Sequence, residues 1–131
     1  MKRRVLITLA VIVGVLIIAG GLFKIRYDKM VRTFREERVE SVYLQDIDDG
    51  VYSGSFGDFL VSVTLDVTVS DNRIADISII EQRGGPGYEA LETLDLILEA
   101  QTPLVDAVSG ATGSSRCIMI AVYKALSDKD L

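Results

Sequence analysis

The 131-residue chain contains no histidine, no tryptophan, two prolines and a single cysteine, Cys117. One cysteine cannot form an internal disulfide, and without histidine or a cysteine cluster the chain lacks the usual ligands of zinc and haem. The absence of histidine also excludes a nucleophile–histidine catalytic pair. Cys117 lies within an apolar segment that is predicted to be helical. We therefore interpret it as a small buried hydrophobic residue rather than a reactive thiol.

Charge is divided unevenly along the chain. The first 41 residues contain nine Lys or Arg and four Asp or Glu, whereas residues 42–131 contain five Lys or Arg and fifteen Asp or Glu. Because nucleic-acid binding requires clusters of cations to neutralise phosphates, the acidic second part argues against a nucleic-acid partner. Its roughly ninety residues suffice for one modest hydrophobic core and leave no room for a separate catalytic domain.

An unbroken apolar run occupies residues 5–23, directly after Lys2-Arg3-Arg4. As a helix, a run of about this length spans the hydrocarbon core of a bilayer. We predict an uncleaved membrane anchor over residues 1–23. The alternative is a cleaved signal peptide, since Ala19 and Gly21 have the small-residue spacing of a weak cleavage site. Basic residues flank the run on both sides, so the positive-inside rule leaves its orientation open.

Residues 24–45 are predicted to form a polar, helical stalk. Charged residues lie at helix-neighbour spacings, and Met30, Val31, Phe34 and Val39 form a broken apolar stripe. The basic residues beside the anchor can lie on anionic lipid headgroups. Otherwise we expect the stalk to be solvated.

Residues 46–131 are predicted to form one α+β domain, a small antiparallel sheet packed with helices. The clearest signal is the alternation of apolar and polar residues over 60–69, which is typical of a half-buried antiparallel strand. Turn residues follow this strand, and we expect a hairpin. The expected strands are 50–56, 60–69 and 74–81, with a turn at 57–58 between the first two. The expected helices are 88–100 and 115–126. In the first of these helices we expect Leu91 to face inward, and we expect Pro103 to end the helix.

Residues 106–115 read Asp-Ala-Val-Ser-Gly-Ala-Thr-Gly-Ser-Ser and place four hydroxyls just before the last predicted helix. The start of a helix has free N–H groups and the positive end of the helix dipole, so it binds anions such as phosphate. The alternative is a plain loop that ends in a serine helix cap.

The pattern Asp-Ala-x-Ser-Gly-Ala-Thr-x-Ser over 106–114 resembles the flavinylation motif of the FMN-binding domain family. That family includes the C subunit of sodium-pumping NADH:quinone oxidoreductases and the G subunit of the Rnf electron-transport complex. The resemblance implies that a flavin transferase attaches FMN through a phosphoester to Ser114. The acceptor here is Ser rather than the commoner Thr, and Gly occupies the variable position. The matching positions are Asp106, Ser109, Gly110, Ala111 and Thr112, with Gly113 at the variable position.

The resemblance also suggests roles for the residues around the acceptor. We expect the N–H groups of residues 115–117 and the Arg116 cation to bind the phosphate, with Gly110 and Gly113 allowing the backbone to approach closely. The hydroxyls of Ser109 and Thr112 would fix the loop or bind the phosphate, whereas Ser115 would contribute its N–H group. Asp106 would either accept backbone N–H bonds, which we prefer, or help the transferase activate the acceptor. The loop 82–87 either lines the flavin ring or only connects two elements.

Three tyrosines, Tyr52, Tyr88 and Tyr123, could stack on a flavin ring, although core packing is the preferred interpretation for each. The implied function is a membrane-anchored flavoprotein that relays electrons outside the cytoplasm, with FMN as its covalent cofactor. Its expected partners are the membrane, the flavin transferase and other redox proteins. One alternative is a membrane-anchored accessory or binding module without covalent flavin. The other is a small flavin reductase.

Overall fold

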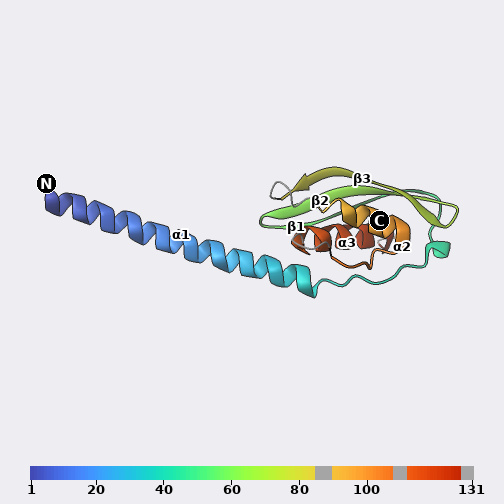
Figure 1. The fold of residues 1–131 in the computed structure, drawn as a ribbon, viewed down its shortest axis with the longest axis horizontal. Coiled ribbons are helices and arrows are strands. Elements are labelled where there is room, and N and C mark those ends of the chain that lie inside the picture. Colours follow the sequence, from blue (N-terminus) through green and yellow to red (C-terminus); the bar gives the residue numbers. More distant parts are fainter. Residues whose placement is uncertain (85–89, 108–111, 128–131) are drawn as a thin grey trace.

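The computed structural model describes residues 1–84, 90–107 and 112–127. Within them a long N-terminal helix precedes a three-stranded antiparallel sheet and two further helices, which confirms the predicted α+β class (Figure 1). The elements, in chain order, are α1 (Lys2–Glu36), the short 3-10 helix η1 (Leu44–Asp46), β1 (Gly50–Asp58), β2 (Val61–Ser70), β3 (Arg73–Arg83), α2 (Glu92–Ala100) and α3 (Thr112–Ser127).

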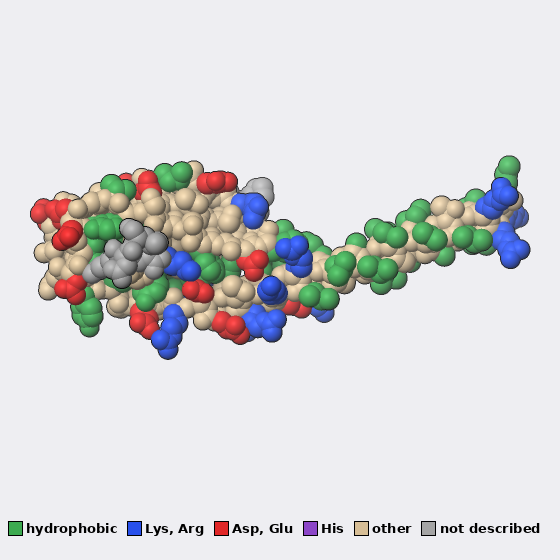
Figure 2. Space-filling view, turned by 180° about the vertical axis from the view of Figure 1, so that it is seen from behind, with side chains coloured by type: hydrophobic (Ala, Val, Ile, Leu, Met, Phe, Trp, Pro, Cys, Tyr) green, Lys and Arg blue, Asp and Glu red, His purple; other side chains and the backbone are tan. Residues whose placement is uncertain are grey.

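The helix α1 continues without interruption through the apolar run and into the predicted stalk, and it ends at Glu36. It is long and apolar enough to cross a membrane, and the apolar window is not buried by any other described part of the chain. Figure 2 shows hydrophobic side chains along the middle of this helix, with Lys and Arg at its free end and again where it meets the rest of the chain. Residues 37–43 are not helical, so the predicted stalk helix is shorter than expected.

The expectation of a solvated stalk is wrong for Met30 and Phe34, each of which is only 4% exposed. The ring of Phe34 lies 5.2 Å from that of Phe56 on β1. The Met30 thioether accepts the Leu60 N–H at 3.5 Å. The apolar stripe of the stalk therefore has a partner, the end of the β1–β2 hairpin, because burying these side chains removes apolar surface from water.

The sheet has the order β1-β2-β3, and the predicted alternation on β2 is confirmed by its burial. Successive strand residues point to opposite faces, so one face of β2 is buried and the other is more exposed. Both outer strands are longer than expected. Gly57 pairs with Ser62 instead of beginning the turn, which lies at Phe59 and Leu60. The predicted turn between β2 and β3 is present, with positive φ at Asp71 and Asn72 (53° and 61°).

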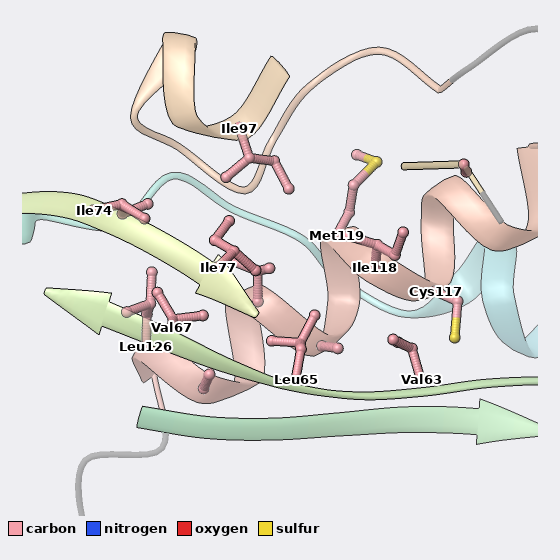
Figure 3. Packing of buried hydrophobic residues seen from close by; sticks show 14 of the residues in the cluster. Val63, Leu65, Val67, Ile74, Ile77, Ile97, Cys117, Ile118, Met119 and Leu126 are labelled. Carbon is pink, nitrogen blue, oxygen red and sulfur yellow. The ribbon is translucent and has the colours of Figure 1, made fainter. Parts of the chain in front are cut away.

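The core lies between the sheet and α3. Figure 3 shows Val63, Leu65 and Val67 on β2 facing Cys117, Ile118 and Leu126 on α3, with Ile97 of α2 beside them. The residues of α3 that are 1% exposed or less are Cys117, Ile118, Ile120, Ala121, Val122, Leu126 and Ser115. Such continuous burial explains why α3 is apolar over most of its surface and not only along one stripe.

The helix α2 begins at Glu92, four residues later than predicted, and Leu91 is 56% exposed rather than inward. Ala90 has a positive φ of 55°, which is not helical, so the helix begins only after it. The helix ends at Ala100 because Gln101 adopts the left-handed conformation. The Gln101 side chain also bonds both backbone groups of Ile74 on β3 (2.7 and 3.0 Å), so this helix end is set by a tertiary contact rather than by Pro103.

Candidate functional site

The hydroxyl residues that were predicted to precede the last helix lie partly inside it. Thr112 is the first residue of α3, and Ser114 lies in its first turn. In a helix only the N–H groups at the very start lack a partner four residues earlier, so free donors end at about Ser114. The expectation that the N–H groups of Arg116 and Cys117 would bind an anion is therefore wrong, because these groups lie within the helical hydrogen-bond pattern.

Ser114 is only 5% exposed and lies close to the end of β3. A Cβ atom on Gly84 would lie 3.7 Å from the Ser114 Oγ. The backbone of Gly84 therefore lies next to this hydroxyl, and Gly84 has no side chain that could cover it. Sequence reasoning placed the loop 82–87 near the site but gave no specific role to Gly84. A lone glycine in a Gly/Pro-rich loop carries no signal that could have singled it out.

The neighbouring serine points elsewhere. Ser115 is fully buried, and its Oγ accepts a hydrogen bond from the Thr93 hydroxyl of α2 at 3.2 Å. Thr93 is itself fully buried. Adjacent residues of a helix face directions about 100° apart, which is why Ser115 contacts α2 while Ser114 lies near Gly84.

Arg116 does not extend toward the start of α3. Its guanidinium donates from Nε and Nη2 to the Phe34 carbonyl (3.2 and 3.1 Å) and from Nη2 to the Glu37 carbonyl (2.9 Å). The last carbonyls of a helix lack intrahelical donors and carry partial negative charge, so a cation is favourable there. The expectation that Arg116 neutralises a bound phosphate is therefore wrong, since its donors hold the end of α1.

The other predicted residues of the motif are only partly placed. Asp106 is exposed and follows α2 in a segment without regular structure, whereas Thr112 and Gly113 are exposed at the start of α3. An open depression of about 550 Å³ adjoins Asp106. It is lined by Leu96, Glu99, Ala100, Leu104, Val105 and Asp106. Some of the predicted residues lie outside the described part of the chain: the site residues Ser109, Gly110 and Ala111, the loop residues 85–87 and Tyr88.

Two further expectations can be compared with the structure. The half-buried ring of Tyr52 packs against the core, and its hydroxyl donates to the Asp48 carbonyl at 2.7 Å, which matches the preferred core interpretation.

The Cys117 thiol donates to the Phe56 carbonyl at 3.1 Å. Burial raises the pKa of this thiol from 9.0 to about 12, with a backbone hydrogen bond at Val63 acting in the opposite direction. The interpretation of Cys117 as an inert core residue is thus confirmed.

Comparison with known proteins gives one family. The model of the FMN-binding domain matches residues 61–127, which extend from β2 to the end of α3 and include the whole first turn of α3. No curated protein matches the chain. The match covers half of the chain and supports FMN as the cofactor and a flavin-binding, electron-carrying role. The chain belongs to the FMN-binding domain family.

Proposed function

We propose that this protein is a membrane-anchored flavoprotein electron carrier in which Ser114 holds FMN through a phosphoester. The observation that carries the proposal is the position of the Ser114 hydroxyl, in the first turn of α3 and beside the backbone of Gly84. The family match and the Asp-Ala-x-Ser-Gly-Ala-Thr-x-Ser pattern, which ends at Ser114, both support it.

The described residues fit a phosphoester at this position. A phosphodiester keeps one negative charge, which the free N–H groups of Thr112 and Gly113 and the positive end of the α3 dipole would stabilise. The missing Cβ of Gly84 leaves room beside the Ser114 Oγ. The exposed Thr112 hydroxyl would add a donor. When bound, the flavin would supply the redox chemistry, and the protein would hold and orient it.

A carrier role accounts for the remaining chemistry of the chain. The sequence contains no histidine, and the described residues contain no cluster of metal-ligating side chains. The Cys117 thiol is buried and protonated. These residues offer no obvious acid–base pair for turnover of a substrate. We therefore infer that electrons pass through the flavin between redox proteins that the chain meets as partners.

The long helix α1 supports a location at a membrane. Its exposed apolar run would cross the bilayer, with the flavin domain on the extracytoplasmic side, as the family resemblance implies. The flavin transferase and the redox partners would act on the same side. A covalent link would prevent loss of FMN to a compartment where it is not replaced.

The test is the intact mass of the full chain, purified in detergent after expression with and without a flavin transferase. We expect a gain of one FMN minus one water, only with the transferase. Ser114→Ala should abolish the gain and Ser114→Thr should retain it. Ser115→Ala is the matched control, because the Ser115 side chain contacts Thr93 instead, and it should also retain the gain. A flavin that persists in Ser114→Ala would contradict the assignment of the acceptor.

The burial of Ser114 favours one competing function, an accessory module of the same fold without covalent flavin. With only 5% of Ser114 exposed, the hydroxyl is poorly accessible to a transferase. Absence of the mass gain with a competent transferase would support this module. Rapid oxidation of NADH by the purified flavinylated chain alone would instead contradict the carrier and support a reductase.

A further inference from the structure

The turn of the β1–β2 hairpin lies beside the end of the apolar run of α1. The ring of Phe59 lies 5.4 Å from the ring of Phe23, the last residue of that run. The Arg26 guanidinium lies 4.8 Å from the centre of the same Phe59 ring. One turn further along α1, the Met30 thioether accepts the Leu60 N–H. We call residues 58–60 the hairpin tip.

The continuity of α1 fixes the height of the hairpin tip relative to a bilayer. No break in the helix separates the apolar run from the residues that contact the tip. If residues 5–23 fill the hydrocarbon core, Phe23 lies at its boundary, and a ring packed on Phe23 lies at the level of the lipid headgroups. Leu60, in the same turn, is 39% exposed, and its side chain would meet the lipid at this level.

The charges around the hairpin tip match an anionic lipid surface. Between residues 24 and 32 of α1 there are four cations and one acid, Asp28. Figure 2 shows Lys and Arg side chains gathered where the long helix meets the domain. Arg26 of α1 and Arg83 of β3 line one open depression of about 650 Å³ together with Asp58. The Asp58 carboxylate accepts the Phe59 N–H at 2.7 Å, within the tip itself.

We propose that the hairpin tip sits in the anionic headgroup layer of the same bilayer that α1 crosses, as a second membrane contact of the domain. The proposal rests on the membrane anchor proposed above, but not on the presence of flavin. Phe and Leu side chains of membrane-surface segments insert at the boundary between headgroups and acyl chains, and arginines keep their charge among the headgroups while their apolar stems lie deeper. Each cation near an anionic surface adds attraction.

The second contact would also orient the candidate flavin site. Arg83 at the end of β3 pairs with Ser62 near the hairpin tip, and the Cys117 thiol contacts Phe56. Gly84, which lies beside Ser114, follows Arg83 directly. The end of the domain that carries Ser114 is therefore the end that would face the bilayer.

Depth-dependent quenching of single fluorescent labels tests this contact. The full chain would carry a cysteine-linked NBD probe at Leu60→Cys, Leu16→Cys or Ser70→Cys, in nanodiscs that contain phosphatidylglycerol and shallow or deep doxyl lipids. The buried native Cys117 does not compete for the label. Ser70 is exposed at the far turn of β2, roughly 30 Å from the tip by strand geometry, and is the matched control.

We expect the Leu60 probe to lose most of its fluorescence with shallow quenchers, the Leu16 probe with deep quenchers, and the Ser70 probe with neither. Replacing phosphatidylglycerol by phosphatidylcholine should weaken the quenching at Leu60 but not at Leu16. A quenched Leu16 probe with an unquenched Leu60 probe would overturn the second contact and leave the anchor in place. An unquenched Leu16 probe would overturn the anchor and this inference with it.

Discussion

Gly54 on β1 lies directly under α3 and sets how closely the helix approaches the sheet. A Cβ on Gly54 would collide with the Ala121 carbonyl and lie 2.8 Å from the Ala125 Cβ. Both neighbours are alanines, so the helix backbone packs almost onto the strand. Because α3 carries Ser114 at its start, this single missing side chain also determines where the candidate acceptor lies relative to β3.

We predict that Gly54→Ala lowers the free energy of unfolding by about 1–3 kcal/mol or more, because the helix must shift to accommodate one methyl group. Gly113→Ala is the matched control. A Cβ on Gly113 would have no atom within 4 Å, and alanine reduces the entropy of the unfolded chain, so stability should be unchanged or rise by up to about 1 kcal/mol. Denaturant unfolding of the two variants measures the difference, and equal effects would contradict the close approach at Gly54.

The buried thiol of Cys117 makes stability depend on pH above about 9. Burial raises its pKa from 9.0 to about 12 in the folded protein, so the unfolded chain loses the proton at lower pH than the folded chain. Its contribution to stability is complete below pH 9.0 and is lost as the pH rises through about 12, at about 1.4 kcal/mol per pH unit. Between pH 8 and 11 the free energy of unfolding should therefore decrease more steeply for the wild type than for Cys117→Ala. Parallel pH profiles would contradict the buried, protonated thiol.

At the scale of elements, α3 is attached to α1 as well as to the sheet. Arg116 holds two carbonyls at the end of α1. Lys124, two turns later, lies 3.5 Å from the Glu37 carboxylate and 5.2 Å from the centre of the Phe56 ring. Both cations are half-buried, but they differ in their contacts: Arg116 donates three hydrogen bonds of 2.9–3.2 Å, whereas the Lys124–Glu37 ion pair is 3.5 Å long and more than a third of each side chain is exposed. Exposed ion pairs add little because water and salt screen them.

We predict that Arg116→Gln loosens the end of α1 and Lys124→Gln does not. Loss of the charged hydrogen bonds of Arg116 should cost about 1–3 kcal/mol, while the exposed pair should cost less than about 1 kcal/mol. Hydrogen exchange of the amides between residues 30 and 40 should accelerate in Arg116→Gln only. Similar exchange in both variants would show that Arg116 does not hold the helix end.

At the scale of the whole molecule, helix α1 and the domain pack against each other, so the domain is not attached through a solvated tether. Met30 and Phe34 of α1 belong to the same buried cluster as the core of the sheet and α3. The acidic domain meets the basic segment of α1 there, so charge also favours the joined arrangement. A flavin on Ser114 would then occupy a defined position relative to the membrane instead of moving over the full reach of a flexible linker.

Two truncated chains measure the contribution of this joint. A chain of residues 24–131 keeps Met30 and Phe34, whereas a chain of residues 46–131 loses both. We predict that the shorter chain is less stable by about 3 kcal/mol or more, because two buried side chains are removed and Phe56 becomes exposed. Thermal unfolding provides the measurement, and residues 24–131 with Phe34→Ala should fall between the two. Equal melting temperatures would mean that the stalk adds nothing to the fold.

The sequence by itself determined the features that depend on neighbours along the chain. The alternation on β2, the apolar run of α1 and the hydroxyls before an apolar helix are short-range patterns, because strand and helix periods place residues on a face within a few positions. They were sufficient to predict the α+β class, the hairpin, and the start of the last helix as the segment that holds the candidate site. Ser109, Gly110 and Ala111 were instead predicted from the resemblance to the flavinylation motif, and the cofactor-binding roles of all the motif residues remain predictions.

Only the tertiary structure decided which groups meet across the molecule. It placed Arg116 on the end of α1 rather than on an anion, turned Ser115 toward Thr93 and set Ser114 beside Gly84. It also buried Phe34 and ended α2 at Ala100, just before Gln101. These contacts join residues that are 20 to 80 positions apart, and no local period specifies them. They follow from a packing in which α3 covers the sheet and, among the described residues, each buried side-chain nitrogen and oxygen atom has a hydrogen-bond partner.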